Sequence, residues 1–312
     1  MSIALQEVAE LIRGETGIVI RDNQLTSLSS AIGRIEPGLD ARAFLTRVAD
    51  PATGGQLLGL LVDEVTVQET YFFREEKALR AVDWAALLRE SHARGDEEIR
   101  VWVPACATGE EAYTLAMLAT EALGPGTIPV SILATDVSTA ALTAATEGVY
   151  SKRSVSGVPP ELADRHLEQA GRVFRLGDEL RSLVRFRHHN LVTGGSPPLG
   201  ESLFDLVVCR NVLIYFEPKA VERVLTSLEA AVRPGGELIL GPRTASPVPP
   251  PAWLRALSSL SAGNRRRRSA SCAGRLASRT ATDRLSPRPR GRTRSRMPSW
   301  PPTPATWTEP SR

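Results

Sequence analysis

From residue 99 onward, short apolar runs alternate with longer stretches of helical periodicity, and this alternation restricts the fold more than any other feature. The pattern predicts strands at 99–103, 130–134, 184–186, 206–209 and 237–240. It predicts one helix that ends near Leu123 and two further helices at 139–146 and 219–232. Strands that alternate with helices in this way are typical of a parallel sheet with helices on both faces. We therefore predict an α/β fold with a doubly wound parallel sheet.

The first predicted strand leads through a turn of small residues into a helix that opens with two carboxylates, Glu110 and Glu111. Helix N-termini in such loops commonly hold phosphate, because unpaired N–H groups and the helix dipole favour negative charge. Two glutamates would repel phosphate and favour a ligand with cationic and hydroxyl groups, such as S-adenosylmethionine. A dinucleotide oxidoreductase is disfavoured, because the loop has only Gly109 where a glycine-rich fingerprint is needed.

An acid also ends the second predicted strand, at Asp136. In open parallel sheets ligands bind beyond the carboxyl ends of the strands, and an acid at this place commonly holds a ribose diol. Taken alone, Asp136 is equally well explained as the N-cap of the next helix. Together with the acidic first loop, it supports an adenosyl ligand.

The fourth predicted strand runs into the string CRNVLIYF at residues 209–216. Cys209 and Arg210 are expected at its carboxyl end, with Tyr215 shortly after, all facing the ligand crevice. The simpler explanation is an arginine that pairs with a surface acid and a tyrosine that packs in the core. Without context, the aromatic residues at 71–73 also fit core packing, and Arg74 fits a solvated charge.

Two regions depart from the sheet pattern. Residues 1–76 have the apolar spacing of short helices and predict an all-helical N-terminal domain, followed by a catalytic domain at 77–242. Between about residues 151 and 187 the spacing is irregular. There we predict a short β excursion, with a helix at 161–169 and a hairpin in which 172–176 is followed by 179–183.

Charge divides the chain after residue 242. Residues 243–312 contain fifteen arginines, no lysine and two acids, which gives this tail a net charge of +13 and leaves −10 for the rest. The tail is rich in proline and serine and lacks apolar periodicity, as in segments that cannot bury enough surface to fold. We expect it to be disordered, or to be the product of out-of-frame translation beginning near codon 242.

The composition also bears on compartment and partners. The N-terminus lacks the basic start and apolar run of a secretory signal, and no later stretch is long and uncharged enough to enter a membrane. The three scattered cysteines suit neither a disulfide framework nor a closed zinc site. We expect a cytoplasmic protein without a metal. Nucleic-acid binding ranks last, because it rests only on Arg265–Arg268 and the scattered arginines up to Arg296, among which no aromatic residue is interleaved until Trp300.

In order along residues 5–241, several strings resemble CheR-type chemotaxis receptor methyltransferases. They are TYFFR (70–74), ACATGEEAY (105–113), ATD (134–136), GVY (148–150), NL (190–191), CRNVLIYF (209–216) and RPGG (233–236). The resemblance implies a Rossmann-like sheet that binds S-adenosylmethionine. It also implies an enzyme that methylates glutamates in the cytoplasmic helical bundle of a chemoreceptor and releases S-adenosylhomocysteine. The alternative is a cofactor-binding signalling module with weak or no activity.

The same resemblance implies how the methionine end of the cofactor is bound. Thr70 and Arg74 contact it, the guanidinium pairing with the cofactor carboxylate. Gln68 stands where the family usually has asparagine and shares that contact. Glu111, with Glu110 beside it, lies near the cofactor amine.

The other implied contacts belong to the adenosine and to the transfer site. Asp136 takes the ribose, and Asn190 and Leu191 border the adenine. Cys209 and Arg210 line the transfer site with Tyr215, and Arg210 and Tyr215 position the acceptor carboxylate by hydrogen bonds.

The chemistry explains why no catalytic histidine is found. A glutamate side chain has a pKa of about 4.3, so the acceptor is ionised at neutral pH and needs no general base. A carboxylate and a sulfonium give two neutral products, so charge is lost on the way to the transition state. Water exclusion and alignment are then the main sources of rate, and positioning can be worth about 7 to 11 kcal/mol.

The chain departs from the family pattern in three places. Receptor docking in the family uses an arginine-rich helix, whereas residues 27–38 offer only Arg34. The excursion near 171–183 is short, so we expect no grip on a receptor tail peptide. The family's last two strands have no counterpart after Gly241, so the fifth strand is expected to leave an uncovered edge.

Overall fold

The computed structural model describes residues 3–124, 126 and 128–241. The expectations for residues 243–312, including disorder and out-of-frame translation, lie outside the described residues. Within the described part, no helix is both long and apolar enough to cross a membrane.

The chain begins with a helical region, as the sequence predicts. It comprises α1 (Ile3–Thr16), the short 3₁₀ turn η1 (Asp22–Gln24), α2 (Leu25–Ile35), α3 (Ala41–Val48) and α4 (Gly54–Val65). Its helices pack around fully buried side chains that include Ile12, Leu28, Phe44 and Leu61. The Asp40 carboxylate caps α3 by accepting a hydrogen bond from the N–H of Ala43 at 2.8 Å. Helix α5 (Trp84–Ala93) follows and leads into the sheet.

The centre of the molecule is a five-stranded parallel sheet in the order β6-β2-β1-β7-β8. Its strands are β1 (Ile99–Pro104), β2 (Val130–Asp136), β6 (Val184–His188), β7 (Phe204–Cys209) and β8 (Val232–Leu240). All five predicted strands are therefore confirmed. The crossovers are made by α6 (Glu110–Leu123), α7 (Thr139–Glu147) and α10 (Pro218–Ala231).

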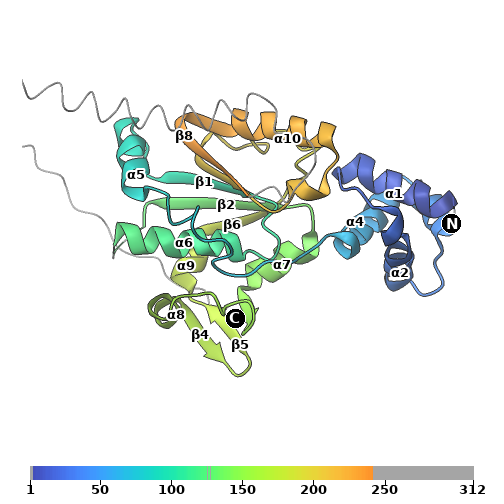
Figure 1. The fold of residues 1–312 in the computed structure, drawn as a ribbon, viewed down its shortest axis with the longest axis horizontal. Helices are drawn as coiled ribbons and strands as arrows, with labels where there is room; N and C mark the ends of the chain where they lie inside the picture. Colours follow the sequence, from blue (N-terminus) through green and yellow to red (C-terminus); the bar gives the residue numbers. More distant parts are fainter. Residues whose placement is uncertain (1–2, 125, 127, 242–312) are drawn as a thin grey trace, which may run out of the picture. The chain divides into compact units, whose positions relative to one another are not determined.

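The two faces of the sheet are covered by different helices. Helix α10 lies over one face and α6 with α7 over the other (Figure 1). Alternate residues of β1, β2 and β7 supply the two cores: Trp102 and Val207 pack toward α10, whereas Val101 and Val208 pack toward α5 and α6. Both faces are thus buried, which explains the nearly continuous apolar strand sequences.

The excursion between β2 and β6 corrects one part of the sequence analysis. It contains β3 (Val149–Ser151), α8 (Pro160–His166), β4 (Leu167–Ala170), β5 (Val173–Leu176) and α9 (Asp178–Ser182), with a three-stranded antiparallel sheet in the order β3-β5-β4. The helix predicted at 161–169 ends at His166, and the hairpin pairs β4 with β5 instead of 172–176 with 179–183.

A glycine explains where the hairpin turns. Gly171 has a φ of +65°, a conformation that favours glycine, and it begins the two-residue connection between Ala170 and Val173. Residues 179–183 were expected to be extended, but acidic residues in the first turn and the buried Leu180 fit the helix α9 that is observed.

Strand β8 lies at one edge of the parallel sheet. Among the described residues it pairs only with β7. The register of this pairing shifts between Phe204 and Leu206 of β7. Within the described residues, the other side of β8 has no neighbouring strand, which agrees with the uncovered edge expected from the sequence.

Candidate functional site

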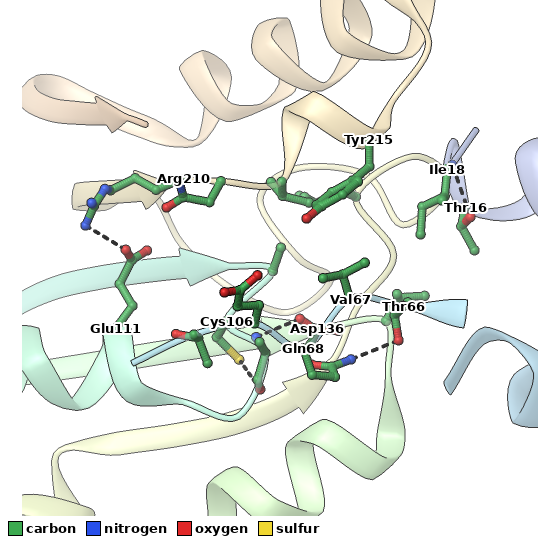
Figure 2. Close-up of a pocket in the computed structure, with 18 of the residues that line it drawn as sticks. Thr16, Ile18, Thr66, Val67, Gln68, Cys106, Glu111, Asp136, Arg210 and Tyr215 are labelled. Atoms are coloured by element: carbon green, nitrogen blue, oxygen red, sulfur yellow. Dashed lines mark hydrogen bonds and ion pairs between the residues drawn. The ribbon is translucent and has the colours of Figure 1, made fainter. Parts of the chain in front are cut away.

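A pocket lies at the carboxyl ends of β1, β2 and β7, where the sequence places the candidate residues (Figure 2). The candidate residues that line it are Gln68, Thr70, Arg74, Glu111, Asp136, Asn190, Leu191, Arg210 and Tyr215. They come from the segment before α5, the start of α6, the last residue of β2, and the segments that follow β6 and β7. The fold therefore gathers residues from most of the described chain around one hollow.

Two candidate residues lie outside this lining. The carboxylate of Glu110 is buried and accepts hydrogen bonds from the hydroxyls of Thr108 at 2.7 Å and Ser154 at 2.6 Å. Cys209 packs in the core beneath α10, and burial raises the pKa of its thiol. Glu110 thus ties the start of α6 to the excursion, and Cys209 fills the sheet core.

The loop after β1 approaches the pocket with its backbone. Ala105 and Ala107 have φ values of 55° and 48°, and Gly109 has a φ of 92°. A left-handed backbone conformation costs free energy in residues other than glycine, and it persists only where the surrounding structure fixes it. Here the N–H of Cys106 donates to the carbonyl of Thr135 at 3.0 Å, so the loop is held against the end of β2.

Asp136 is the second element that holds this loop. The residue is 7% exposed, and its carboxylate accepts hydrogen bonds from the N–H groups of Ala107 at 2.8 Å and Ser138 at 2.9 Å. Burial raises the pKa of Asp136, and these hydrogen bonds oppose the rise. A carboxylate has about four acceptor positions. Its remaining acceptor capacity suits hydroxyl donors of a ligand.

Glu111 and Arg210 form a partly buried ion pair at 2.8 Å, drawn as a dashed line in Figure 2. The Arg210 side chain is only 1% exposed, and it also contacts the Glu75 carboxylate at 3.2 Å and the Arg74 carbonyl at 2.8 Å. Burial raises the pKa of Glu111 to about 7, although the Arg210 charge acts in the opposite direction. A cationic ligand group nearby would favour the ionised form.

The segment before α5 supplies an unsatisfied acceptor. The Gln68 amide donates to the Thr66 hydroxyl at 2.8 Å, but its oxygen is buried and accepts no hydrogen bond from the described residues. Buried polar atoms normally have a partner, so this oxygen suits an ammonium or hydroxyl donor of a ligand. Close by, Arg74 donates to the Glu69 carbonyl at 2.5 Å and lies over the Tyr71 ring.

The remaining walls come from the segments after β6 and β7. The Asn190 amide donates to the Glu15 carbonyl at 2.8 Å, and its oxygen accepts from the N–H of Val192 at 2.9 Å. The side chain of Tyr215 enters from the opposite wall, and its hydroxyl points into the hollow (Figure 2). Leu191 adds apolar surface beside them.

Several lining residues were missed by the sequence analysis. Cys106, His189, Thr16 and Ile18 belong to this group. Burial lowers the pKa of His189, which favours a neutral ring. Cys106 lay within a string already singled out, whereas no pattern in the sequence connects Thr16 and Ile18 with residues two hundred positions away.

The pocket defines the chemical class of its ligand. The lining includes the carboxylates of Glu111 and Asp136 and the unsatisfied amide oxygen of Gln68, so the pocket suits a ligand with cationic and hydroxyl groups and disfavours phosphate. Within the described residues, no group of three or more His, Cys, Asp or Glu side chains is placed to hold a metal ion. With the parallel sheet, these features define a Rossmann-like S-adenosylmethionine-dependent methyltransferase.

Comparison with known proteins gives the family. Residues 68–249 match the family model described as CheR methyltransferase, SAM binding domain. Chemotaxis protein methyltransferase 1 of Pseudomonas aeruginosa is 33% identical over 233 residues, covering 72% of this chain and 84% of that protein. Chemotaxis protein methyltransferase 2 of the same organism is 34% identical over 245 residues, covering 76% and 84%. The chain therefore belongs to the CheR methyltransferase family, and its cofactor is S-adenosylmethionine.

A further relative is named for biofilm formation. The probable biofilm formation methyltransferase WspC of Pseudomonas aeruginosa is 34% identical over 186 residues, covering 60% of this chain and 44% of that protein.

Proposed function

We propose that the protein methylates glutamate side chains in the cytoplasmic helical bundle of a chemoreceptor, and that it works in the cytoplasm. The products are a glutamate methyl ester and S-adenosylhomocysteine. The observation that supports this most is the buried acidic pocket of a CheR family member, which has a tyrosine hydroxyl facing into it. Because relatives named as chemotaxis methyltransferases match over most of their length, an inactive signalling module is not favoured.

The cofactor supplies a methyl group on a sulfonium, and the transfer forms a carbon–oxygen bond as the carbon–sulfur bond breaks. Asp136 accepts hydrogen bonds from the ribose hydroxyls with its remaining acceptor capacity. Asn190 and Leu191 border the adenine. In this assignment, residues at the ends of β2 and β6 would hold the adenosine.

The methionine end of the cofactor lies toward α6. Glu111 and the free oxygen of Gln68 accept from its amine, while Arg74, with Thr70, holds its carboxylate. One guanidinium nitrogen of Arg74 donates to the Glu69 carbonyl, and the other N–H groups of the guanidinium can donate to a carboxylate. Glu110 and Cys209 do not contact the cofactor in this assignment. They stabilise helix α6 and strand β7, which position the residues that line the pocket.

The acceptor glutamate approaches Tyr215. An ionised carboxylate needs no general base, so the tyrosine hydroxyl has only to donate a hydrogen bond to one oxygen and leave the other free to react. Arg210 was expected to share this role. Its guanidinium is instead engaged by Glu111, Glu75 and a carbonyl, so we assign it to fixing Glu111 and the segment at Arg74.

Helix α2 offers little positive charge for docking on an acidic receptor. Arg34, its only arginine, pairs with Glu64 of α4 at 2.6 Å. Exposed pairs of this kind are weak, so a receptor carboxylate could still exchange for Glu64.

A methyl-transfer assay tests the proposal. Tritiated S-adenosylmethionine is incubated with native-cell membranes and wild-type protein, Asp136→Asn, or the control Asp178→Asn, whose carboxylate is 95% exposed. We expect alkali-labile label on receptor bands with the wild type and the control, and a loss of about tenfold or more with Asp136→Asn, because hydrogen bonds to a charged carboxylate are lost. Cofactor binding without receptor labelling by the wild type would contradict the proposal and support the signalling module.

A further inference from the structure

The segment that leaves α1 lies against two walls of the pocket. It consists of residues 15–19, and we call it the connecting segment. Two of its side chains, Thr16 and Ile18, line the pocket directly. The turn out of the helix is fixed by hydrogen bonds: the Gly17 N–H donates to the Arg13 carbonyl at 2.9 Å, and the Ile18 N–H donates to the Thr16 hydroxyl at 3.2 Å.

The connecting segment is bonded to the loop that holds Tyr215. The N–H of Val19 donates to the carbonyl of Tyr215 at 2.9 Å, and Ile18 forms an antiparallel bridge with Phe216. On the adjoining turns, Arg13 pairs with Glu217 at 2.7 Å. The backbone on both sides of the tyrosine is therefore tied to the helical region.

The same segment is also bonded to the wall after β6. The Glu15 carbonyl accepts a hydrogen bond from the Asn190 amide at 2.8 Å. Gly17, with a φ of +74°, packs so closely that a Cβ there would lie 2.8 Å from Cγ2 of Val192. Its neighbours on the other side are Ala220 and Phe216, at 3.5 and 3.7 Å from the same Cβ position. A side chain at this position has no free space and an unfavourable backbone conformation.

We propose that Gly17 and Val19 are positioning residues for methyl transfer: the connecting segment sets where the Tyr215 hydroxyl lies relative to the cofactor wall at Asn190. This inference rests on the proposed role of Tyr215 in placing the acceptor. It gives the helical region a part in the reaction besides any receptor docking. A displacement of about 1 Å in a reacting geometry can cost about 100-fold in rate, so a small change at Gly17 is expected to have a large effect.

Two glycines of the same helix end provide the test and its control. Gly17→Ala introduces a Cβ against Val192, whereas a Cβ at Gly14 meets no atom within 4 Å. We expect Gly17→Ala to lower kcat by about 10- to 100-fold, with a smaller change in cofactor affinity, and Gly14→Ala to change neither. The double variant Gly17→Ala/Val192→Ala removes the closest contact and is expected to recover part of kcat.

A double-mutant cycle shows whether Gly17 acts through the tyrosine. In a Tyr215→Phe background, Gly17→Ala should cost much less in kcat than it does in the wild type. Full additivity of the two substitutions would overturn the proposal, as would equal kcat values for Gly17→Ala and Gly14→Ala.

A second readout does not depend on the receptor. Amide hydrogen exchange at residues 211–217 should accelerate in Gly17→Ala and stay unchanged in Gly14→Ala. Unchanged exchange in both variants would contradict the positioning role even if the wild type labelled no receptor. Absence of labelling by the wild type, with faster exchange in Gly17→Ala, would contradict the proposed function alone.

Discussion

The two ends of strand β7 each carry a buried charge, and they use it differently. At the start, the Asp205 carboxylate is 2% exposed and contacts Arg94, Arg233 and the N–H of Arg100. Just beyond the other end, the Arg210 side chain is 1% exposed and contacts Glu111 and Glu75. The strand thus separates two ion-pair clusters of similar composition.

The difference lies in what surrounds each charge. The arginines around Asp205 also pair with Asp96, at 2.5 Å from Arg233 and 3.3 Å from Arg94, so that cluster closes on itself. The cluster at Arg210 borders a hollow, and its partner Glu111 has a pKa near 7. The first arrangement stabilises the sheet, and the second prepares acceptor groups for a cationic ligand.

The largest effect is expected for Arg210→Met. Removing the guanidinium leaves Glu111 buried without its cation, which typically costs about 3 to 5 kcal/mol of folding stability, part of it relieved by protonation of Glu111. Methyl transfer should fall at least about 100-fold because the segment at Arg74 also loses its anchor. Urea unfolding and steady-state kinetics measure the two losses. Transfer within about twofold of the wild type would contradict the assignment.

At the opposite end, Asp205→Asn is expected to lower stability by about 3 kcal/mol, because it removes the charge of a buried carboxylate that Arg94, Arg233 and the N–H of Arg100 share. Cofactor affinity should stay within about twofold of the wild-type value, since this cluster does not line the pocket. Urea unfolding together with calorimetric titration makes the comparison. A large loss of affinity without a loss of stability would show that the two ends of β7 are not separate in function.

The smallest expected effect is the pH dependence from Glu111. Because burial raises its pKa to about 7 from 4.5, the folded state binds a proton that the unfolded state releases. The contribution of this group to stability therefore decreases as pH rises from about 4.5 to about 7. Cofactor affinity should rise about threefold to tenfold between about pH 6 and about pH 8, as the carboxyl becomes ionised.

The variant Glu111→Gln serves as the reference for this effect. Its affinity should be lower at high pH and nearly independent of pH over the same range. An identical pH profile in Glu111→Gln and the wild type would assign the titration to another group.

The parallel sheet could be predicted because its strands are buried on both faces and so appear as short apolar runs. Asp136 and Arg210 could be predicted for the same reason, since a charged residue directly after such a run lies at the carboxyl edge. Periodicity could not distinguish Glu110 from Glu111. Successive helix residues point about 100° apart, so only one of the two faces the hollow.

The errors arose where structure depends on contacts that the local sequence does not encode. The excursion at 167–183 is made of strands and helices of four or five residues, too short for a periodic pattern. Thr16 and Ile18 reach the pocket only because the connecting segment packs on the segments after β6 and β7. Such long-range packing is specified by the whole fold.

The central claim is that acidic groups at the ends of the parallel strands bind a cationic methyl donor. Isothermal titration of the purified protein with S-adenosylmethionine, and in parallel with a pyrophosphate-bearing dinucleotide, tests it most directly. We expect saturable binding of S-adenosylmethionine that S-adenosylhomocysteine displaces, and no binding of the dinucleotide. Lack of affinity for the methyl donor, or equal affinity for the dinucleotide in the same pocket, would contradict the account.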